Sequence, residues 1–361
     1  MSDGPSRDLT RSPTRGSSGD SSRGRVVAVP CEGEDVLALF ALATGEPLGD
    51  VPVGSHPVHA TTRRGRTFVA TMGDRAVTAV DPNGEVTRIE TGVLGPSHFA
   101  AANGELFVSC SAGDALAVID PESLALVDRI AVGAEPHEVA VAPGGRRLYA
   151  GSRRDGVVDV VDPVAHERIG SIGIGDGARV QGVAVSPDGS RGYAVDQSSA
   201  RIVAFETDTA ADPDTAPAPA PAPDPDPILG AAAVGADPYD LVVTADRVFV
   251  PGRGDGVVHE FDRDLGLVAV HEGFARPVDL FRIGDDWWVL DAAAGRLRSL
   301  AGAVVETPAP GLVATPVREP TRSDRLVVSH YDDDRISLVD VDDGAVWTAE
   351  TPAYPFGSVV V

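Results

Sequence analysis

The sequence predicts an all-β fold, an eight-bladed β-propeller made of four-stranded antiparallel blades. A three-residue anchor recurs along the chain, mostly 39 or 40 residues apart. Each interval holds four short runs of alternating apolar residues separated by turn formers. A fixed period of this length is typical of repeat architectures, and small sheets that cannot bury both faces alone do so by stacking radially. The anchors are Pro57-Val58-His59, Pro96-Ser97-His98, Pro136-His137-Glu138, Val180-Gln181-Gly182, Pro238-Tyr239-Asp240, Pro277-Val278-Asp279, Pro316-Val317-Arg318 and Pro355-Phe356-Gly357.

The chain begins with a segment, residues 1–24, that is rich in Ser, Arg, Gly and Asp and has no apolar core. Such a composition predicts a disordered tail and does not resemble a secretory signal peptide. No run of about 18 apolar residues occurs, so no transmembrane helix is expected. The propeller domain is therefore predicted over residues 25–361, with a cytoplasmic location as the default expectation.

The clearest blade covers residues 136–172. Its first apolar run ends at the turn formers Pro143-Gly144-Gly145, and its third follows Asp155-Gly156. Four period-2 runs within about 40 residues indicate an antiparallel meander of four strands.

The two ends of the repeat region complement each other. The first copy, which starts near residue 26, lacks a preceding anchor strand, and the last anchor, at residues 354–361, has no strands after it. The C-terminal strand is therefore predicted to become the innermost strand of the first blade and to close the ring.

The segments VGAEPHEVAVAPGGRRLYAGSRRDGVVDVVDP and VQGVAVSPDGSRGYAV resemble the YVTN repeats of surface-layer-type and YncE-like propeller proteins. The resemblance covers roughly residues 26 to 361. It implies the propeller fold, but the family includes binding proteins, scaffolds and enzymes, so it implies no single activity.

Residues 207–227 interrupt the fifth blade between its predicted third and fourth strands. Alternating Ala-Pro and Asp-Pro cannot join a hydrogen-bonded ladder, so the segment is predicted to be a flexible insertion.

The composition of the chain excludes two classes of binding partner. The net charge is −24, and nucleic acids and anionic membranes are bound through clustered basic residues, so neither is expected as a partner. Cys31 and Cys110 are the only cysteines and are predicted to lie two blades apart, so no disulfide framework is expected.

The third residue of each anchor is predicted to lie at the mouth of the central channel. Imidazole and carboxylate groups together are the ligand chemistry of Zn, Mn or Fe. His59, His98 and Glu138, from consecutive blades, are the predicted metal ligands. His98 and Glu138 are also the candidate catalytic residues, with a carboxylate or His98 as the base. Tyr239, Asp240, Asp279 and Arg318 are candidate ligand-binding residues. Polar channel rims that bind nothing are also common, and the sequence leaves that alternative open.

A second ring is predicted where each second strand ends. Several of its members follow an anchor's third residue by 12 positions, as Cys110 follows His98. They are therefore expected to be near cross-strand neighbours of those third residues. Asp291 and His330 are for this reason further candidates for ligand binding, whereas His137 is expected to cap a loop. The second ring comprises Cys31, Thr71, Cys110, Ser152, Asp196, Gly252, Asp291 and His330.

Three functional hypotheses follow. The first is a propeller that binds a small ligand, a metal ion or a partner protein at the channel mouth. The second is a metal-dependent enzyme, such as a lactone hydrolase or a lyase. The third is a haem d1-like tetrapyrrole or metal-handling protein. No catalytic Ser-His-Asp order or phosphate-binding glycine loop decides among them, so the sequence leaves open whether the chain is an enzyme.

Overall fold

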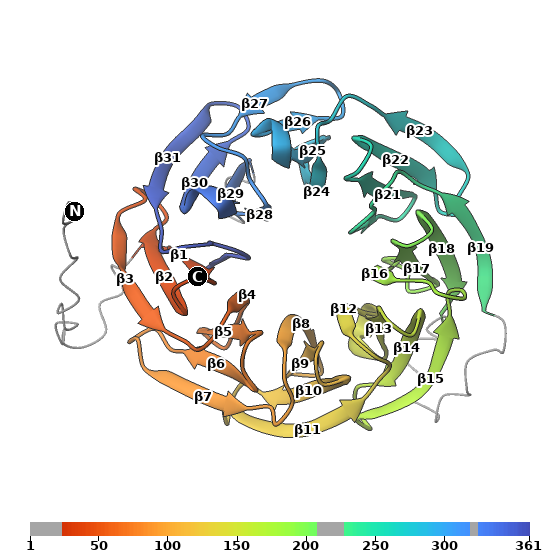
Figure 1. Cartoon of the computed structure of the whole chain (residues 1–361), viewed down its shortest axis with the longest axis horizontal. Coiled ribbons are helices and arrows are strands. Elements are labelled where there is room, and N and C mark those ends of the chain that lie inside the picture. The colour runs from red at the N-terminus through yellow and green to blue at the C-terminus, as the bar shows by residue number, and fades with distance from the viewer. Residues whose placement is uncertain (1–23, 208–226, 318–323) are drawn as a thin grey trace, which may run out of the picture.

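The computed structural model describes residues 24–207, 227–317 and 324–361. These residues form eight four-stranded antiparallel sheets arranged as a ring around a central channel (Figure 1). The predicted eight-bladed propeller is therefore confirmed. Within the described residues, no helix is long and apolar enough to cross a membrane.

The first four blades, numbered from the N-terminus, follow one another around the ring. Blade one contains β1 (Val26–Cys31), β2 (Val36–Ala41), β3 (Pro47–Pro52) and β32 (Val359–Val360). Blade two contains β4 (Pro57–Arg63), β5 (Arg66–Thr71), β6 (Ala76–Val80) and β7 (Val86–Glu90). Blade three contains β8 (Pro96–Ala102), β9 (Glu105–Cys110), β10 (Ala115–Asp120) and β11 (Ala125–Ala131). Blade four contains β12 (Pro136–Val141), β13 (Leu148–Ser152), β14 (Val157–Asp162) and β15 (Glu167–Gly173), with the 3₁₀ turn η1 (Pro143–Gly145).

The remaining four blades complete the ring. Blade five contains β16 (Val180–Val185), β17 (Arg191–Asp196), β18 (Arg201–Glu206) and β19 (Ile228–Ala233). Blade six contains β20 (Val242–Val243), β21 (Arg247–Gly252), β22 (Val257–Asp262) and β23 (Leu267–His271). Blade seven contains β24 (Pro277–Ile283), β25 (Asp286–Asp291), η2 (Ala292–Ala294), β26 (Arg296–Ser299) and β27 (Val304–Glu306). Blade eight contains β28 (Val313–Pro316), β29 (Arg325–His330), η3 (Tyr331–Asp333), β30 (Arg335–Asp340) and β31 (Gly344–Glu350).

The ring closes as predicted. β32 is the innermost strand of blade one and pairs with β1, with Val27 opposite Val360. The amide of Val26 donates to the carbonyl of Val361 at 3.0 Å, and the amide of Val361 donates back at 2.8 Å. The two ends of the propeller domain are thus joined by backbone hydrogen bonds, and blade one gains its fourth strand.

The hydrophobic core lies between adjacent blades. Between blades four and five, Tyr149 and Val160 pack against Val183 and Phe205, all of them buried. The outermost strands, such as β3, are mostly exposed. Since each blade buries both faces of its inner strands against its neighbours, the innermost strands are held rigidly around the channel.

A bulge follows the anchor in several innermost strands. In blade two, Pro57 pairs with Thr71 but His59 pairs with Ala70, so β4 carries one extra residue. The same shift occurs in β8, β12, β16 and β24. In blades two, three, four and seven the second-ring residue therefore lies opposite the anchor proline, as Cys110 lies opposite Pro96. The expectation that Cys110 is a near cross-strand neighbour of His98 is wrong, because the spacing argument did not include the extra residue.

Blade eight departs from the predicted register. Its innermost strand, β28, runs from Val313 to Pro316, and Pro316 pairs with Leu326. Pro316 therefore ends the innermost strand, whereas the other anchors lie where theirs begin. Pro316 follows Pro277 by 39 residues, which equals the repeat period, but Pro316 does not occupy the position in its blade that Pro277 occupies in blade seven.

Two predicted segments lie largely outside the described residues. The predicted tail, residues 1–24, is described only at residue 24, and the insertion only at Thr207 and Pro227. The strands on either side of the insertion, β18 and β19, are the third and fourth strands of blade five.

Candidate functional site

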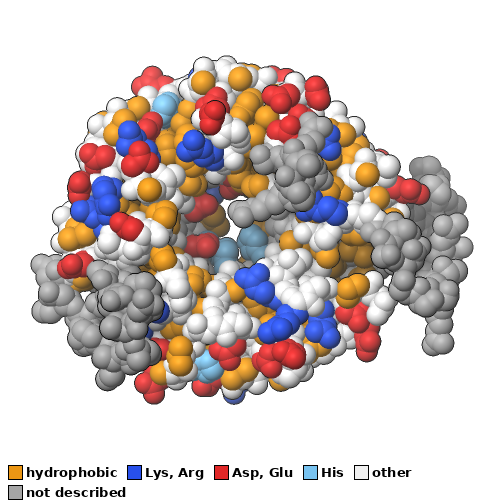
Figure 2. Space-filling view, turned by 180° about the vertical axis from the view of Figure 1, so that it is seen from behind, with side chains coloured by type: hydrophobic (Ala, Val, Ile, Leu, Met, Phe, Trp, Pro, Cys, Tyr) orange, Lys and Arg blue, Asp and Glu red, His pale blue; other side chains and the backbone are white. Residues whose placement is uncertain are grey.

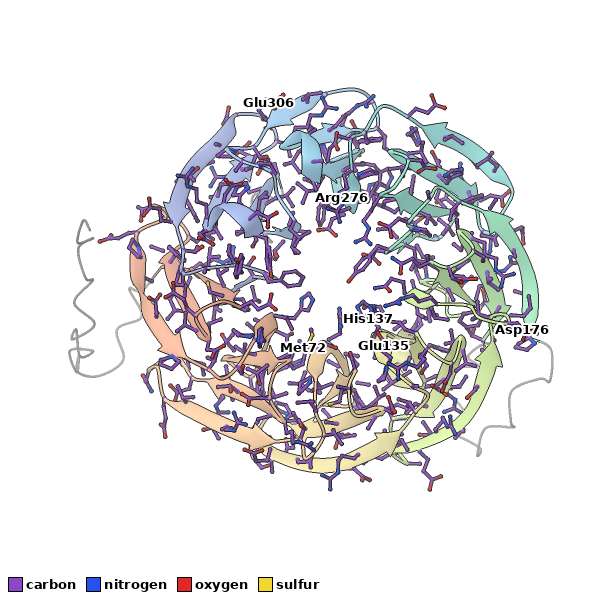
Figure 3. The ribbon with its side chains drawn as sticks, in the orientation of Figure 1. Met72, Glu135, His137, Asp176, Arg276 and Glu306 are labelled. Atoms are coloured by element: carbon purple, nitrogen blue, oxygen red, sulfur yellow. The ribbon has the colours of Figure 1, made fainter. Side chains whose placement is uncertain are left out.

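Three imidazole rings lie in a row at the channel, with His98 in contact with the other two. They come from the innermost strands β4, β8 and β12 of consecutive blades. The ring centroids of His59 and His98 are 4.6 Å apart, and those of His98 and His137 are 4.2 Å apart. His137 points into the central opening (Figure 3). The structure thus brings together two of the predicted metal ligands and adds a third imidazole.

Aromatic side chains extend this row in both directions. The ring of Phe356 lies 5.0 Å from that of His59, and the ring of Tyr239 lies 5.7 Å from that of His137. The guanidinium carbon of Arg253 lies 4.0 Å from the centre of the Tyr239 ring. The channel is therefore lined on one side by flat rings.

Carboxylates occupy the same channel. Glu138 follows His137 on β12, while Asp240 precedes β20 and Asp279 lies on β24. Figure 2, which views the ring from behind, shows histidine and acidic side chains inside the central opening. All three carboxylates are partly buried.

The acids hold their protons more tightly than usual. Burial, followed by the charge of Asp240, raises the pKa of Glu138 to about 8. Burial raises the pKa of Asp240, and burial together with Asp240 raises the pKa of Asp279 to about 7. Because desolvation disfavours the ionised form, Glu138 and Asp279 are partly protonated near neutral pH in the absence of a bound cation.

The imidazoles are neutral. Burial lowers the pKa of His59 to about 4 and that of His137 to about 3, and it also lowers the pKa of His98 well below the ordinary value. For His98, the neighbouring His137 and His59 add to this effect. A neutral imidazole is the form that binds a metal ion.

The ligand atoms of His98, His137 and Glu138 all lie within 4.8 Å of one another. Two imidazole nitrogens and one carboxylate oxygen at this spacing match the donor set of Zn, Mn or Fe. Among the described residues, Nδ1 of His98 is buried and has no hydrogen-bond partner. A buried polar atom without a partner is costly, and a metal ion would satisfy it. These residues therefore fit a divalent transition metal.

The hydrogen bonds of His137 determine its tautomer. Its Nδ1 lies 3.0 Å from the backbone carbonyl of Gln181. A carbonyl only accepts, so Nδ1 carries the proton and Nε2 keeps its lone pair. This arrangement is the usual support for a metal-binding histidine. Nε2 lies 3.4 Å from the Tyr239 hydroxyl and 3.4 Å from Nε2 of Gln181.

The remaining predicted residues lie elsewhere. Asp291 is fully buried and accepts hydrogen bonds from the amides of Ala275 and Arg276, both at 2.8 Å. His330 is also fully buried, and its two ring nitrogens contact the Pro310 carbonyl at 3.1 Å and the Ser337 hydroxyl at 2.7 Å. Both side chains use their polar atoms within the loops and blades. Arg318 lies outside the described residues.

The sequence argument missed His137. His137 was expected to cap a loop, and in a regular strand its side chain and that of Glu138 would point to opposite faces. The bulge between Pro136 and Val139 breaks this alternation and lets adjacent residues both reach the channel. The sequence did contain a signal for His137 as a candidate ligand, because it is a histidine directly before the predicted ligand Glu138.

The fold resembles several solved structures. The dihydro-heme d1 dehydrogenase NirN superposes with a TM-score of 0.71 and 14% identity over 97% of this chain and 78% of NirN. AztD of Citrobacter koseri gives 0.60 and 13% over 93% of this chain and 98% of AztD. The hydrazine synthase of Kuenenia stuttgartiensis gives 0.54 and 16% over 75% of this chain and 91% of that chain.

At such low identity these similarities establish the fold alone. Neither a protein-family model nor a curated protein sequence matches the chain. The relationship to YVTN repeats and the cytoplasmic location therefore stay predictions.

Proposed function

We propose that this propeller binds a divalent transition-metal ion in its channel through His98, His137 and Glu138, and that the metal holds a small ligand. The close approach of the three ligand atoms, within 4.8 Å of one another, carries the proposal. Three protein ligands leave at least one coordination position open, which is the arrangement of metal sites that bind exchangeable molecules.

His59 has a supporting position. Its ring lies 4.6 Å from that of His98, so a small movement would make it a fourth ligand, as the sequence suggested. Alternatively, since it is neutral near pH 7, it could accept a proton from a molecule held at the open position. The second role is the one that a metal-dependent hydrolase or lyase would require.

A tetrapyrrole is the second candidate ligand. NirN, which has a TM-score of 0.71 and spans 97% of this chain in the superposition, was solved in complex with DHE. In this chain, the neutral imidazoles of His59, His98 and His137 are groups of the kind that hold haem iron. The flat rings of Phe356 and Tyr239 would contact a macrocycle.

Calorimetric titration of untagged protein with Zn²⁺, Mn²⁺ and Fe²⁺ tests the proposal, with elemental analysis of the purified protein beside it. At least one metal is expected to bind with one ion per chain. His98→Ala and His137→Ala are each expected to weaken binding by about 100-fold or more. The matched control is His166→Ala, because His166 lies between β14 and β15, the two outer strands of blade four, and contacts Glu105 at 2.9 Å and Asp128 at 3.6 Å.

Absence of metal binding, or binding that is unchanged in both channel variants, would contradict the proposal. Visible absorption of protein purified from cells supplied with haem precursors separates the two candidates. A chromophore that is retained by wild type and lost in the channel variants favours the tetrapyrrole, whereas colourless protein with stoichiometric metal favours the small-ligand site.

A further inference from the structure

Arginine side chains gather beside the imidazoles in a chain whose overall charge is strongly negative. Arg153 and Arg154 follow β13, and Arg179 precedes β16. Their guanidinium nitrogens lie 3.4, 3.7 and 3.5 Å from the carboxylate of Glu135. Three guanidinium groups thus share one carboxylate side chain, while Asp114, Asp155 and Asp196 accept hydrogen bonds from backbone amides of the same loops.

The loop before β12 does not need all three guanidinium groups to hold its conformation. The amide of Arg153 already donates to the Glu135 carbonyl at 3.1 Å, and the amide of Arg154 donates to the Ala134 carbonyl at 3.2 Å. These backbone bonds hold the loop before β12 in place. By contrast, Arg253 is matched by a single carboxylate, because its Nε and Nη2 both lie 3.1 Å from oxygens of Asp237. Three guanidinium groups therefore contact the Glu135 carboxylate, whereas Asp237 holds Arg253 through two nitrogens.

Arg153 is the most enclosed member. Its side chain is 20% exposed, against 46% for Arg179 and 75% for Arg154. Among the described residues, its Nε is buried and has no hydrogen-bond partner. Burial lowers the pKa of Arg153, and the nearby charge of Arg179 adds to this effect. A buried guanidinium N–H without an acceptor costs free energy, and an anionic ligand could accept a charge-assisted hydrogen bond from it.

These charges act on the candidate metal ligands. After burial, the charge of Arg153 contributes to the lowered pKa of both His98 and His137, and Arg179 contributes to that of His137. The geometry agrees, because Arg153 contacts Glu135 through its guanidinium and its amide, and Glu135 lies directly before β12, which carries His137 and Glu138. A small molecule bound at the open side of the site would have these guanidinium groups beside it.

We propose that Arg153 and Arg179 form an oxyanion subsite, and that the ligand of this channel is a small acid. Its carboxylate or phosphate group would bind the two guanidinium groups while its other end reaches the metal. The geometry of guanidinium matches both kinds of oxyanion. This inference rests on the proposed function, because one molecule is to contact both places.

The test is calorimetric titration of zinc-loaded and zinc-free protein with succinate and, separately, with inorganic phosphate. At least one probe is expected to bind the zinc-loaded protein saturably, and the two arms separate a carboxylate from a phosphate site. Arg153→Gln and Arg179→Gln are each expected to weaken that binding tenfold or more and to leave zinc affinity within about threefold of wild type. Arg153→Lys, which keeps the charge but loses the planar fork, should recover part of the loss.

Arg154→Gln is the matched control, since it removes the same charge from the neighbouring, exposed position. It should change anion affinity less than threefold. Equal losses in Arg153→Gln and Arg154→Gln would reduce the effect to general electrostatics and overturn the inference. Thermal melting of each variant shows whether it is folded.

The two proposals can fail separately. Zinc binding without saturable anion binding overturns the subsite and leaves the metal site standing. Anion binding without zinc binding overturns the metal site and, with it, the claim that one molecule contacts both. Where both bind, zinc should strengthen succinate binding, and succinate should strengthen zinc binding by the same factor, because linkage is reciprocal.

Discussion

His98 and His137 are held as neutral donors by their surroundings. Burial makes the imidazolium form costly at both positions, and a backbone carbonyl fixes the proton of His137 on Nδ1. Glu138, the third member of the group, is held in the opposite way, because burial favours its protonated form. The two imidazoles are therefore ready to bind a cation at neutral pH, whereas the carboxyl group must first lose a proton.

Metal affinity should depend on pH through Glu138. Below a pKa of about 8 the metal competes with a proton on this carboxyl group, so affinity should rise by up to about tenfold per pH unit between roughly pH 6 and 8, then level off. The imidazoles titrate well below this window and add little slope. Calorimetry across pH 5.5–9 measures it. Glu138→Gln should bind more weakly and show a flatter profile; an unchanged slope in that variant would exclude Glu138 as the source.

The same carboxyl group should affect the stability of the metal-free protein with a defined sign. Its folded-state pKa lies above the ordinary value, so its favourable contribution is present at low pH and is lost as pH rises towards about 8. Bound metal removes this trend because it stabilises the ionised form.

Gly357 is the residue-scale test of packing around His59. A Cβ atom at this position would fall on the His59 ring. Gly357→Ala should lower the free energy of unfolding in urea by about 1–3 kcal/mol, which is typical of overpacking. Gly173→Ala is the control, since a Cβ there meets no atom within 4 Å. A Gly357→Ala variant as stable as this control would mean that the His59 ring moves freely.

At the scale of the strand, the bulge beside the anchor determines which residues reach the channel. It places the second-ring residues of blades two, three, four and seven opposite the anchor prolines and brings His137 and Glu138 to the same site. The repeat period could not reveal this extra residue, because a residue that recurs at the same place in blades two, three, four, five and seven leaves the spacing between their anchors unchanged. In blade eight the repeat period predicted the wrong position for the innermost strand, since Pro316 ends that strand.

Substitution of Asp291 tests whether this residue stabilises the loop before β24 or binds a ligand at the channel. Its Oδ1 accepts from two backbone amides, and Oδ2 lies 3.1 Å from Nε of Arg296. Asp291→Ala leaves these buried donors unmatched and should cost about 3–5 kcal/mol of stability in urea unfolding. Metal affinity should stay within about threefold of wild type. Asp246→Ala, at a position that is 74% exposed, should change stability by less than about 0.5 kcal/mol. A large loss of metal affinity in Asp291→Ala would instead support its predicted role in ligand binding.

At the scale of the whole molecule, the sequence predicted the blade count, the strand number per blade and the closure of the ring. These properties follow from many repeated positions, so a single misread anchor does not change them. The site depends on individual side chains and on local register. His59 and His98 could be found from anchor spacing, whereas His137 required the actual backbone path.

Closure by β32 should be a large contribution to stability. Deleting residues 358–361 removes the strand that pairs with Val27 and Ala28, together with the two hydrogen bonds between Val26 and Val361. The free energy of unfolding should fall by about 3 kcal/mol, from several hydrogen bonds worth about 1 kcal/mol each. The exposed edge of β1 should also promote self-association, which size-exclusion chromatography detects. Val346→Ala, on the exposed face of β31, is the control. An unaltered, monomeric deletion variant would show that β32 does not secure the ring.

The ring of eight similar blades is not chemically uniform at the level of the third anchor residues. His59 and His98 stand on blades two and three, Asp240 and Asp279 on blades six and seven, and Gly182 of blade five offers no side chain between the two groups. A molecule that enters along the axis would meet the imidazoles together with Glu138 on one flank and two aspartates on the other, so it could not turn freely about that axis. The scaffold should therefore distinguish the two enantiomers of a chiral guest, although its backbone repeats almost evenly around the circle.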